Sequence, residues 1–289
     1  MSLRSDVRPR PLLLVSLSLA VSALVAAFAA PPARSDHPGL ALETRGKGEP
    51  TLVLIHGLGM DRDEWDRVAP LLEARHKLVA IELPGHGASA PLTKVSVTAI
   101  AQELDRTLRH QKIKNPVLVG HSYGALVALE EAAAHPGSVR GVITIDLGTY
   151  VDADSERIAN LVDLIDRRYP LFIRGVFESM TRDSSQVDSV LTKASRVPRS
   201  VMSEYFQDVW KTDLRPRIQN LKTPVLVVAT DIVWPSNESW EAAQTRLGYQ
   251  TAGPVTGKRI YGSGHLVPLD QPDTLAAAIL DFTASLKKK

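Results

Sequence analysis

The sequence lacks cysteine, a strong net charge and, after its first thirty residues, any long apolar run. Without cysteine the chain forms no disulfide and carries no lipid-modified cysteine, so a packed core must supply its stability. The formal net charge is +2, and it vanishes when Arg4, Asp6, Arg8 and Arg10 are set aside. A neutral body argues against nucleic-acid binding as the main task. No segment after residue 30 is long and apolar enough to span a bilayer.

The N-terminal segment has the features of an export signal. Residues 1–11 carry three arginines, and residues 12–30 (LLLVSLSLAVSALVAAFAA) carry no charge. Residues 27–29, Ala-Phe-Ala, have the small-x-small pattern that a signal peptidase reads. We therefore expect a signal peptide over residues 1–29.

Two locations remain open for the mature chain. If the signal is cleaved, residues 30–39 (APPARSDHPG) form a disordered leader, and the protein is periplasmic or secreted. The alternative is a membrane anchor formed by residues 12–30, which is near the lower length limit for spanning a bilayer. Its serines and alanines weaken that interpretation. Contact with a membrane is expected only if this segment stays attached.

From residue 40 onward, short apolar runs alternate with helical patterns. This alternation predicts an α/β fold with a mostly parallel, buried sheet and helices on both faces. The expected strands are residues 51–56, 77–83, 116–120, 139–147, 223–231 and 257–265. The expected helices are residues 63–75, 97–113, 124–136 and 274–286.

One region interrupts the alternation. Residues 148 to about 220 contain no convincing buried strand, and their apolar residues recur at helical spacing. A segment of this length is too long for a structureless loop in a compact domain. We expect one domain over residues 40–289, with a helical cap inserted at about 148–220.

The segment Gly120-His121-Ser122-Tyr123-Gly124 stands between an expected strand and an expected helix. A serine there occupies a strained turn, and small neighbours let the strand and helix approach closely. The turn lifts the hydroxyl to the sheet edge and to the N-terminus of a helix. Serine alone is a poor nucleophile and needs a base that is oriented by a carboxylate. Downstream, an aspartate and then a histidine follow further strands.

Four segments in this order resemble the α/β-hydrolase superfamily, in its branch of esterases and lipases with a serine nucleophile. The resemblance covers roughly residues 40–286. The segments correspond to the family's oxyanion loop and second turn, nucleophile elbow, acid-bearing strand end and histidine loop, and they are residues 52–89, 117–146, 223–235 and 262–282.

The resemblance implies a role for each matching residue. Ser122 is the expected nucleophile, His265 the base and Asp231 the acid, and the backbone amides of Leu58 and Tyr123 are expected to form the oxyanion hole. A serine at this position argues against the family's epoxide hydrolases and haloalkane dehalogenases, which use aspartate there. The resemblance implies no cofactor, and the spacing of histidines and carboxylates indicates no metal site.

The acid position departs from the family pattern. The loop VVATDIVWP lacks the usual glycine before Asp231, and Asp146 at the end of the strand VITID is a rival. We favour Asp231, which lies four residues before Pro235 as the family pattern has it. His56, His86 and His121 flank the motifs, and we expect them to hold loops rather than to act as the base.

The expected activity is hydrolysis of a small carboxylic ester through an acyl-enzyme on Ser122. An aromatic content of 5% and the absence of a strongly apolar lid favour a small ester over a long-chain lipid. The alternatives on the same triad are a carbon–carbon bond hydrolase and a cofactor-free haloperoxidase. An intact Ser, Asp and His set argues against a receptor-like binding protein. The expected partner is a small molecule, and the sequence indicates no oligomeric state.

N-terminal sequencing of protein from the cell envelope and the medium tests the export signal. We expect the mature chain to begin at Ala30, because Ala27 and Ala29 then occupy the two small-residue positions. Cleavage after Ala30 would put Phe28 in one of those positions. An intact Met1 or Ser2 on membrane-pelleted protein would show that residues 12–30 act as an anchor.

Overall fold

The computed structural model describes residues 39–286. The predicted signal peptide and all but the last residue of the predicted leader lie outside this range. Within it, none of the helices has the length and apolar character needed to cross a membrane.

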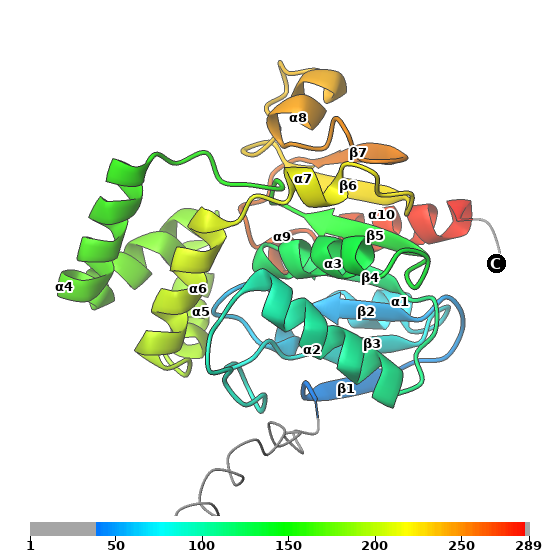
Figure 1. The fold of residues 1–289 in the computed structure, drawn as a ribbon, viewed down its shortest axis with the longest axis horizontal. Coiled ribbons are helices and arrows are strands. Elements are labelled where there is room, and N and C mark those ends of the chain that lie inside the picture. Colours follow the sequence, from blue (N-terminus) through cyan, green and yellow to red (C-terminus); the bar gives the residue numbers. More distant parts are fainter. Residues whose placement is uncertain (1–38, 287–289) are drawn as a thin grey trace, which may run out of the picture. The chain divides into compact units, whose positions relative to one another are not determined.

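Seven strands form one sheet in the order β1-β3-β2-β4-β5-β6-β7 (Figure 1). Only β1 runs antiparallel to its neighbour, and all other pairs are parallel. The strands are β1 (Leu42–Arg45), β2 (Leu52–Ile55), β3 (Leu78–Ile81), β4 (Val117–His121), β5 (Gly141–Ile145), β6 (Val225–Thr230) and β7 (Val255–Ile260). The predicted α/β class and mostly parallel sheet are confirmed, and β1 is a strand that the sequence pattern did not reveal.

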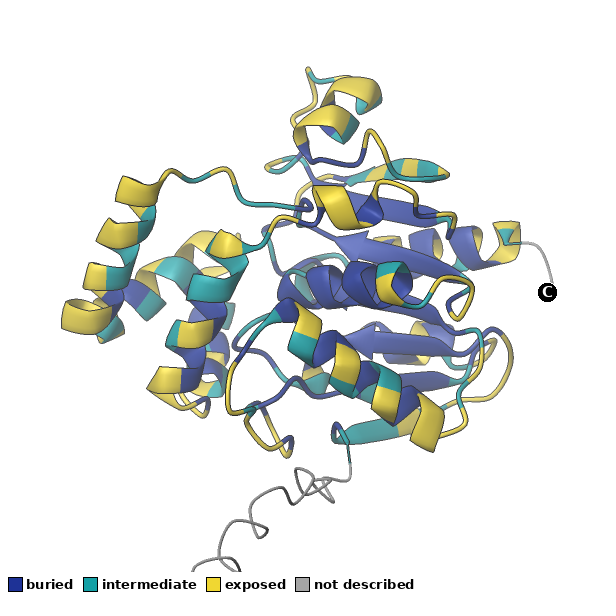
Figure 2. Ribbon diagram, viewed as in Figure 1, coloured by how far each residue is buried: buried dark blue, intermediate teal, exposed yellow. Residues whose placement is uncertain are grey.

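Helices cover both faces of the sheet. On one face α2 (Val97–His110) and α3 (Tyr123–Ala134) pack on the strands, and on the other α1 (Ala69–Leu72) and α10 (Pro272–Ser285) do so. Successive residues of the central strands enter opposite cores, as Val53 does on the first face and Leu54 on the second. The central strands are therefore buried on both sides, which explains their continuous apolar sequence (Figure 2).

The chain between β5 and β6 is helical and forms the inserted cap. It contains α4 (Ser155–Met180), the short 3₁₀ helix η2 (Ser184–Gln186), α5 (Val187–Ala194), α6 (Arg199–Lys211) and α7 (Arg215–Ile218). Figure 1 shows α4, α5 and α6 grouped at one side of the strands. We call these three helices the cap helices. Helix α4 is kinked at Arg168, two residues before Pro170, which has no N–H to donate to the helix.

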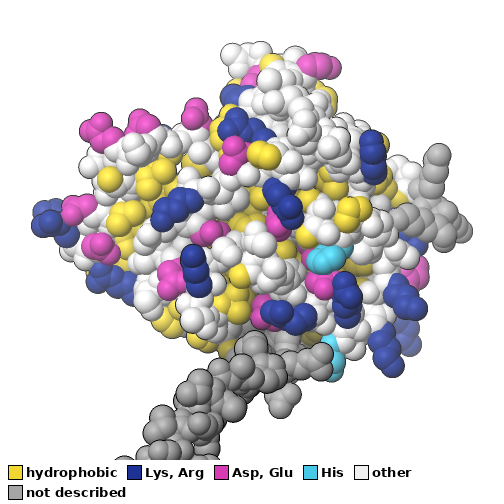
Figure 3. All heavy atoms as spheres, in the orientation of Figure 1, with side chains coloured by type: hydrophobic (Ala, Val, Ile, Leu, Met, Phe, Trp, Pro, Cys, Tyr) yellow, Lys and Arg dark blue, Asp and Glu magenta, His cyan; other side chains and the backbone are white. Residues whose placement is uncertain are grey.

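The remaining short helices lie close to strand ends. They are the 3₁₀ helix η1 (Arg62–Trp65) after β2, α8 (Trp240–Arg246) between β6 and β7, and α9 (Val267–Asp270) before α10. Basic and acidic side chains are interspersed over the face seen in Figure 3, in keeping with the balance of charges in the sequence. The loops after β2, β4, β5 and β6 leave the sheet at its carboxyl edge, where the predicted site residues stand.

Candidate active site

Ser122 occupies a strained turn between β4 and α3. Its φ is +50° and its ψ is −120°, a conformation that costs a non-glycine residue about 1–3 kcal/mol. The Ser122 N–H donates to the carbonyl of Ile145 at 2.9 Å, and the Ser122 carbonyl accepts from Ala125 N–H at 2.8 Å. These two bonds hold the serine at the carboxyl end of β4 and at the start of a twelve-residue helix.

Glycines on either side make this turn possible. A Cβ on Gly120 would lie 2.2 Å from the carbonyl oxygen of Gly124, and a Cβ on Gly124 would lie 2.4 Å from that of Ile55. Both distances are far below van der Waals contact. The Gly-x-Ser-x-Gly spacing is thus required by the close packing of β4, α3 and β2.

His265 is held by Asp146. Its Nδ1 lies 2.8 Å from Oδ2 of Asp146, whose side chain is 2% exposed. The other carboxylate oxygen, Oδ1, accepts the N–H of Thr230 at 2.7 Å, and the Asp146 N–H donates to Val228 at 2.8 Å. A carboxylate fixed in this way keeps the proton of His265 on Nδ1 and leaves Nε2 as an acceptor.

The predicted contact between Asp231 and His265 is wrong in this structure. Both oxygens of Asp231 accept from Nη2 of Arg182, at 3.1 and 3.2 Å, and Arg182 lies in the cap between α4 and η2. The side chain of Asp231 is 26% exposed, so it faces the surface. Asp146, which directly follows β5, faces His265 instead, while Arg182 engages Asp231.

The histidine loop is tied to the residue before the serine. Nε2 of His121 lies 2.8 Å from the carbonyl oxygen of His265, and the two imidazole rings have centroids 4.9 Å apart. His121 immediately precedes Ser122 in the chain. The structure therefore brings the predicted nucleophile and the predicted base to neighbouring positions at one edge of the sheet.

His121 carries a positive charge inside the protein. Its Nδ1 faces the carboxylate of Glu64 at 2.7 Å, and its Nε2 faces the His265 carbonyl. Both partners can only accept, so both ring nitrogens are protonated. Burial opposes the charge, but the charge and hydrogen bond of Glu64 outweigh it and raise the pKa of His121.

Glu64 connects this imidazolium to the oxyanion loop. Burial opposes its ionisation, but the charge and hydrogen bond of His121 prevail and lower the pKa of Glu64. Its second oxygen, Oε2, accepts the N–H of Gly57 at 3.0 Å. One buried carboxylate thus joins the loop after β2 to the elbow. The acidic segment Asp63-Glu64-Trp65-Asp66 gave no sequence signal for this role, because surface helices often carry such residues.

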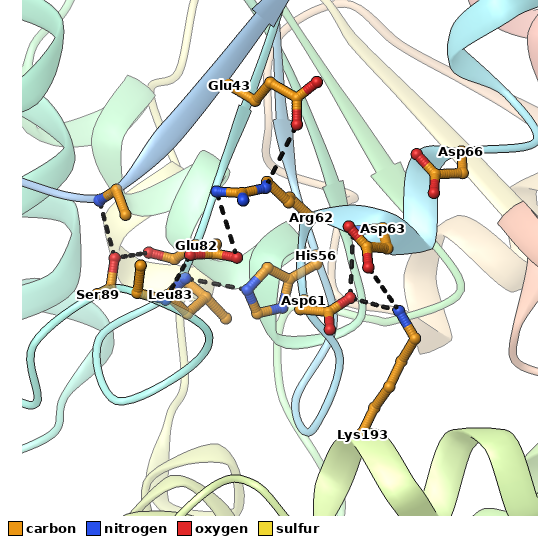
Figure 4. Close-up of polar contacts among 12 residues, drawn as sticks. Glu43, His56, Asp61, Arg62, Asp63, Asp66, Glu82, Leu83, Ser89 and Lys193 are labelled. Carbon is orange, nitrogen blue, oxygen red and sulfur yellow. Dashed lines mark hydrogen bonds and ion pairs between the residues drawn. The ribbon is translucent and has the colours of Figure 1, made fainter.

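Two further buried histidines shape the oxyanion loop, and both stay neutral. Nε2 of His56 accepts from Leu83 N–H at 3.0 Å, and Nε2 of His86 accepts from Gly59 N–H at 3.1 Å. Burial lowers the pKa of His56, and it lowers that of His86 to about 3. Figure 4 shows His56 between this loop and Leu83. The expected structural role of these histidines agrees with their hydrogen bonds.

The two predicted oxyanion amides come from different segments, Leu58 from the loop after β2 and Tyr123 from the start of α3. Tyr123 is the first residue of α3, so its N–H has no acceptor within the helix. Within residues 39–286, the N–H of Leu58 also has no acceptor. Two unpaired amides beside a helix N-terminus suit the binding of a negatively charged oxygen.

The cap reaches this site at several points. A Cβ on Gly59 would lie 2.6 Å from Cζ of Phe177, and a Cβ on Gly264 would lie 2.4 Å from the carbonyl of Met180. Nζ of Lys193 on α5 lies 2.6 Å from Oδ1 of Asp61 in the oxyanion loop (Figure 4). The cap helices therefore touch the oxyanion loop and the histidine loop directly.

A cluster of acidic residues and a histidine joins α2 and the end of α3. Among the described residues, one group of potential metal ligands comes together, Asp105 on α2 with Glu131 and His135 at the end of α3. Nδ1 of His135 lies 3.1 Å from Oε1 of Glu131, and Arg109 pairs with Asp105 at 2.8 Å. Nε2 of His135 also lies 3.9 Å from Oδ2 of Asp105, so the group forms ion pairs within α2, at the end of α3 and between the two.

Comparison with known proteins agrees with the fold. The sequence model of the "Alpha/beta hydrolase family" matches residues 52–278. A pimeloyl-[acyl-carrier protein] methyl ester esterase of Edwardsiella ictaluri is 27% identical over 198 residues, which are 63% of this chain and 75% of that protein. The enzyme of the same name from Yersinia enterocolitica is 24% identical over 259 residues, covering 82% and 94%.

Solved structures show the same architecture. A hydrolase from Oleispira antarctica superposes with a TM-score of 0.75 at 16% identity, over 86% of this chain and 96% of that one. At this identity the likeness establishes the fold alone.

Replacement of Glu64 tests the buried ion pair. Glu64→Ala strands the His121 imidazolium and the Gly57 amide, and we expect it to lower the free energy of unfolding by about 3–5 kcal/mol. Glu64→Gln keeps an oxygen for Gly57 and donates to a neutral His121, so about 1 kcal/mol is expected. Urea unfolding measures both. The control is Glu178→Ala, which breaks an exposed pair with Arg174 and should change little. A loss in Glu64→Ala no larger than in this control would contradict the assignment.

Proposed function

Because the chain belongs to the alpha/beta hydrolase family, we propose that it is a serine hydrolase that cleaves a small carboxylic ester through an acyl-enzyme on Ser122. The observation that carries this proposal is the strained Ser122 at the N-terminus of α3, beside a histidine oriented by a buried carboxylate. The names of the related methyl ester esterases support an ester as the substrate.

In the proposed reaction, the Ser122 oxygen attacks the ester carbonyl while Nε2 of His265 takes the hydroxyl proton. Asp146, in place of Asp231, holds the imidazole by its Nδ1–H and stabilises the positive charge that develops on the ring. The geometry of the pair supports this exchange of roles, since Asp231 is engaged by Arg182. The His265 imidazolium then protonates the leaving alcohol.

The negative charge of the tetrahedral intermediate falls on the former carbonyl oxygen. The N–H groups of Leu58 and Tyr123 are the proposed donors to it. Each donor of this kind typically lowers the barrier by about 3 kcal/mol. The N-terminal end of α3 adds the favourable field of its aligned peptide dipoles.

The second half of the reaction releases the acid. Water loses a proton to Nε2 of His265 and attacks the acyl group on Ser122, and the proton returns to the serine oxygen as the acyl bond breaks. We further propose that the enzyme acts outside the cytoplasm, on the strength of the export features in residues 1–29.

Ser122→Ala tests the nucleophile. Hydrolysis of a panel of p-nitrophenyl esters of increasing acyl length should fall to the background rate, because the acyl-enzyme cannot form. A fluorophosphonate should label the wild type once, on the peptide that contains Ser122. Retention of more than a few per cent of turnover, or labelling on another peptide, would contradict the assignment. Turnover of a ring-cleavage dienoate in place of the esters would favour a carbon–carbon bond hydrolase.

Asparagine substitutions separate the two candidate acids. Asp146→Asn should lower kcat by about 10³- to 10⁴-fold, because the amide favours the wrong tautomer of His265. Asp231→Asn is the matched control at the end of the adjacent strand, and it should change kcat less than about threefold, as it removes only a partly exposed ion pair. The opposite order of the two losses would return the acid to Asp231.

A further inference from the structure

Helix α6 is the part of the cap that docks on the sheet domain beside the elbow. Its buried face packs on the loop after β3, where a Cβ on Gly85 would lie 2.7 Å from Cγ1 of Val201. The hydroxyl of Tyr205 donates to the carbonyl of Pro84 at 2.9 Å. One face of α6 is thus fixed against the loop that follows β3.

Two carboxylates on α6, one helical turn apart, bind the start of α2. Oε2 of Glu204 accepts the N–H of Val95 at 3.0 Å, and Oδ2 of Asp208 accepts the N–H of Val97 at 2.9 Å. The amide of Val97 lies in the first turn of α2 and has no intrahelical acceptor, and the amide of Val95 lies just before the N-cap Ser96. Both acidic residues thus bind the backbone where α2 begins.

Asp208 differs from Glu204 because it also binds the elbow. The hydroxyl of Tyr123 donates to Oδ2 of Asp208 at 2.6 Å, a short bond to a carboxylate. The phenol ring packs edge-on against Tyr205, with ring centroids 4.7 Å apart. Tyr123 is 1% exposed, so both its ring and its hydroxyl are held by residues of α6.

The protonation of this pair suits a lasting hydrogen bond. Burial raises the pKa of Tyr123, and the neighbouring Asp208 charge raises it further, so the phenol remains a donor. Burial also raises the pKa of Asp208, while its bonds from Tyr123 and Val97 oppose that effect. The loss of this bond would leave a buried hydroxyl without a partner.

We propose that Asp208 is a positioning residue for the oxyanion hole. It acts through the side chain of Tyr123, whose backbone amide is a donor in the proposed reaction, and the assignment therefore rests on the proposed function. Tyr123 directly follows the strained Ser122, so a shift of its side chain moves the first turn of α3. When α6 packs on the sheet domain, it therefore also sets the position of the Tyr123 backbone amide.

A double-mutant cycle tests this coupling. Asp208→Ala and Tyr123→Phe each remove one partner, and each should lower kcat by about 10- to 100-fold through misplacement of the Tyr123 amide. KM should change less than about threefold, since the ester ground state makes little use of that amide. The double variant should be no slower than either single variant, because both break the same bond.

Two further variants exclude a merely structural role. Asp208→Asn retains an oxygen that accepts from Tyr123 and Val97, and it should recover most of kcat. Glu204→Ala removes the contact to Val95 without touching Tyr123, so it should keep kcat. It should lower the unfolding midpoint by less than Asp208→Ala does, because Asp208→Ala also leaves the buried Tyr123 hydroxyl unpaired.

Affinity for a trifluoromethyl ketone provides a second readout, because its adduct with the serine places an oxyanion in the hole. The inhibition constant should rise in parallel with the loss of kcat in Asp208→Ala and stay unchanged in Glu204→Ala. Two outcomes would overturn the role of Asp208 while leaving the proposed function standing. One is additive losses of kcat in the double-mutant cycle, and the other is a loss of kcat in Glu204→Ala equal to that in Asp208→Ala. Absence of ester hydrolysis in the wild type would instead overturn the proposed function, and this assignment with it.

Discussion

The buried ion pair of Glu64 and His121 joins the three loops of the site. The carboxylate binds the amide of Gly57 in the oxyanion loop and one nitrogen of His121. The other nitrogen of His121 binds the backbone of the loop that carries His265. A buried charge pair is costly to desolvate and adds little stability over an apolar pair. Its role here is to fix three backbone segments relative to one another. Neither side chain can move away without leaving the other as an unpaired buried charge.

The order of the strands places the other residues of the site beside this ion pair. The strands β2, β4 and β5 are neighbours, so the oxyanion loop, Ser122 and Asp146 leave the sheet side by side. Two hydrogen bonds hold Ser122 in its strained conformation, one from its N–H to Ile145 on β5 and one to its carbonyl from within α3. A left-handed serine persists only where such surroundings over-determine it. The same rigidity favours an electrostatic site whose dipoles need no rearrangement during reaction.

Much of this arrangement could be predicted from the sequence. Continuous apolar runs with helices between them predicted the parallel sheet, and local spacing predicted the turn at Ser122. The carboxylate facing His265 was predicted incorrectly because Asp146 and Asp231 both follow buried strands, and a linear pattern treats them alike. What distinguishes them is Arg182, which reaches Asp231 from the cap. Glu64 and Asp208 were missed for a related reason, since an acidic residue in an amphipathic helix normally indicates only a solvated face.

The cap is attached to the sheet domain by two kinds of contact with different sensitivity to salt. At its rim, Lys193 pairs with Asp61 and Arg182 pairs with the partly exposed Asp231. Near α6, a buried phenol meets Asp208, and Tyr205 meets a backbone carbonyl. Mobile ions screen exposed charges beyond about 8 Å at physiological ionic strength and leave buried bonds largely unaffected. Rising ionic strength therefore weakens the pair of Arg182 with Asp231 more than it weakens the bonds that seat α6 on the sheet domain.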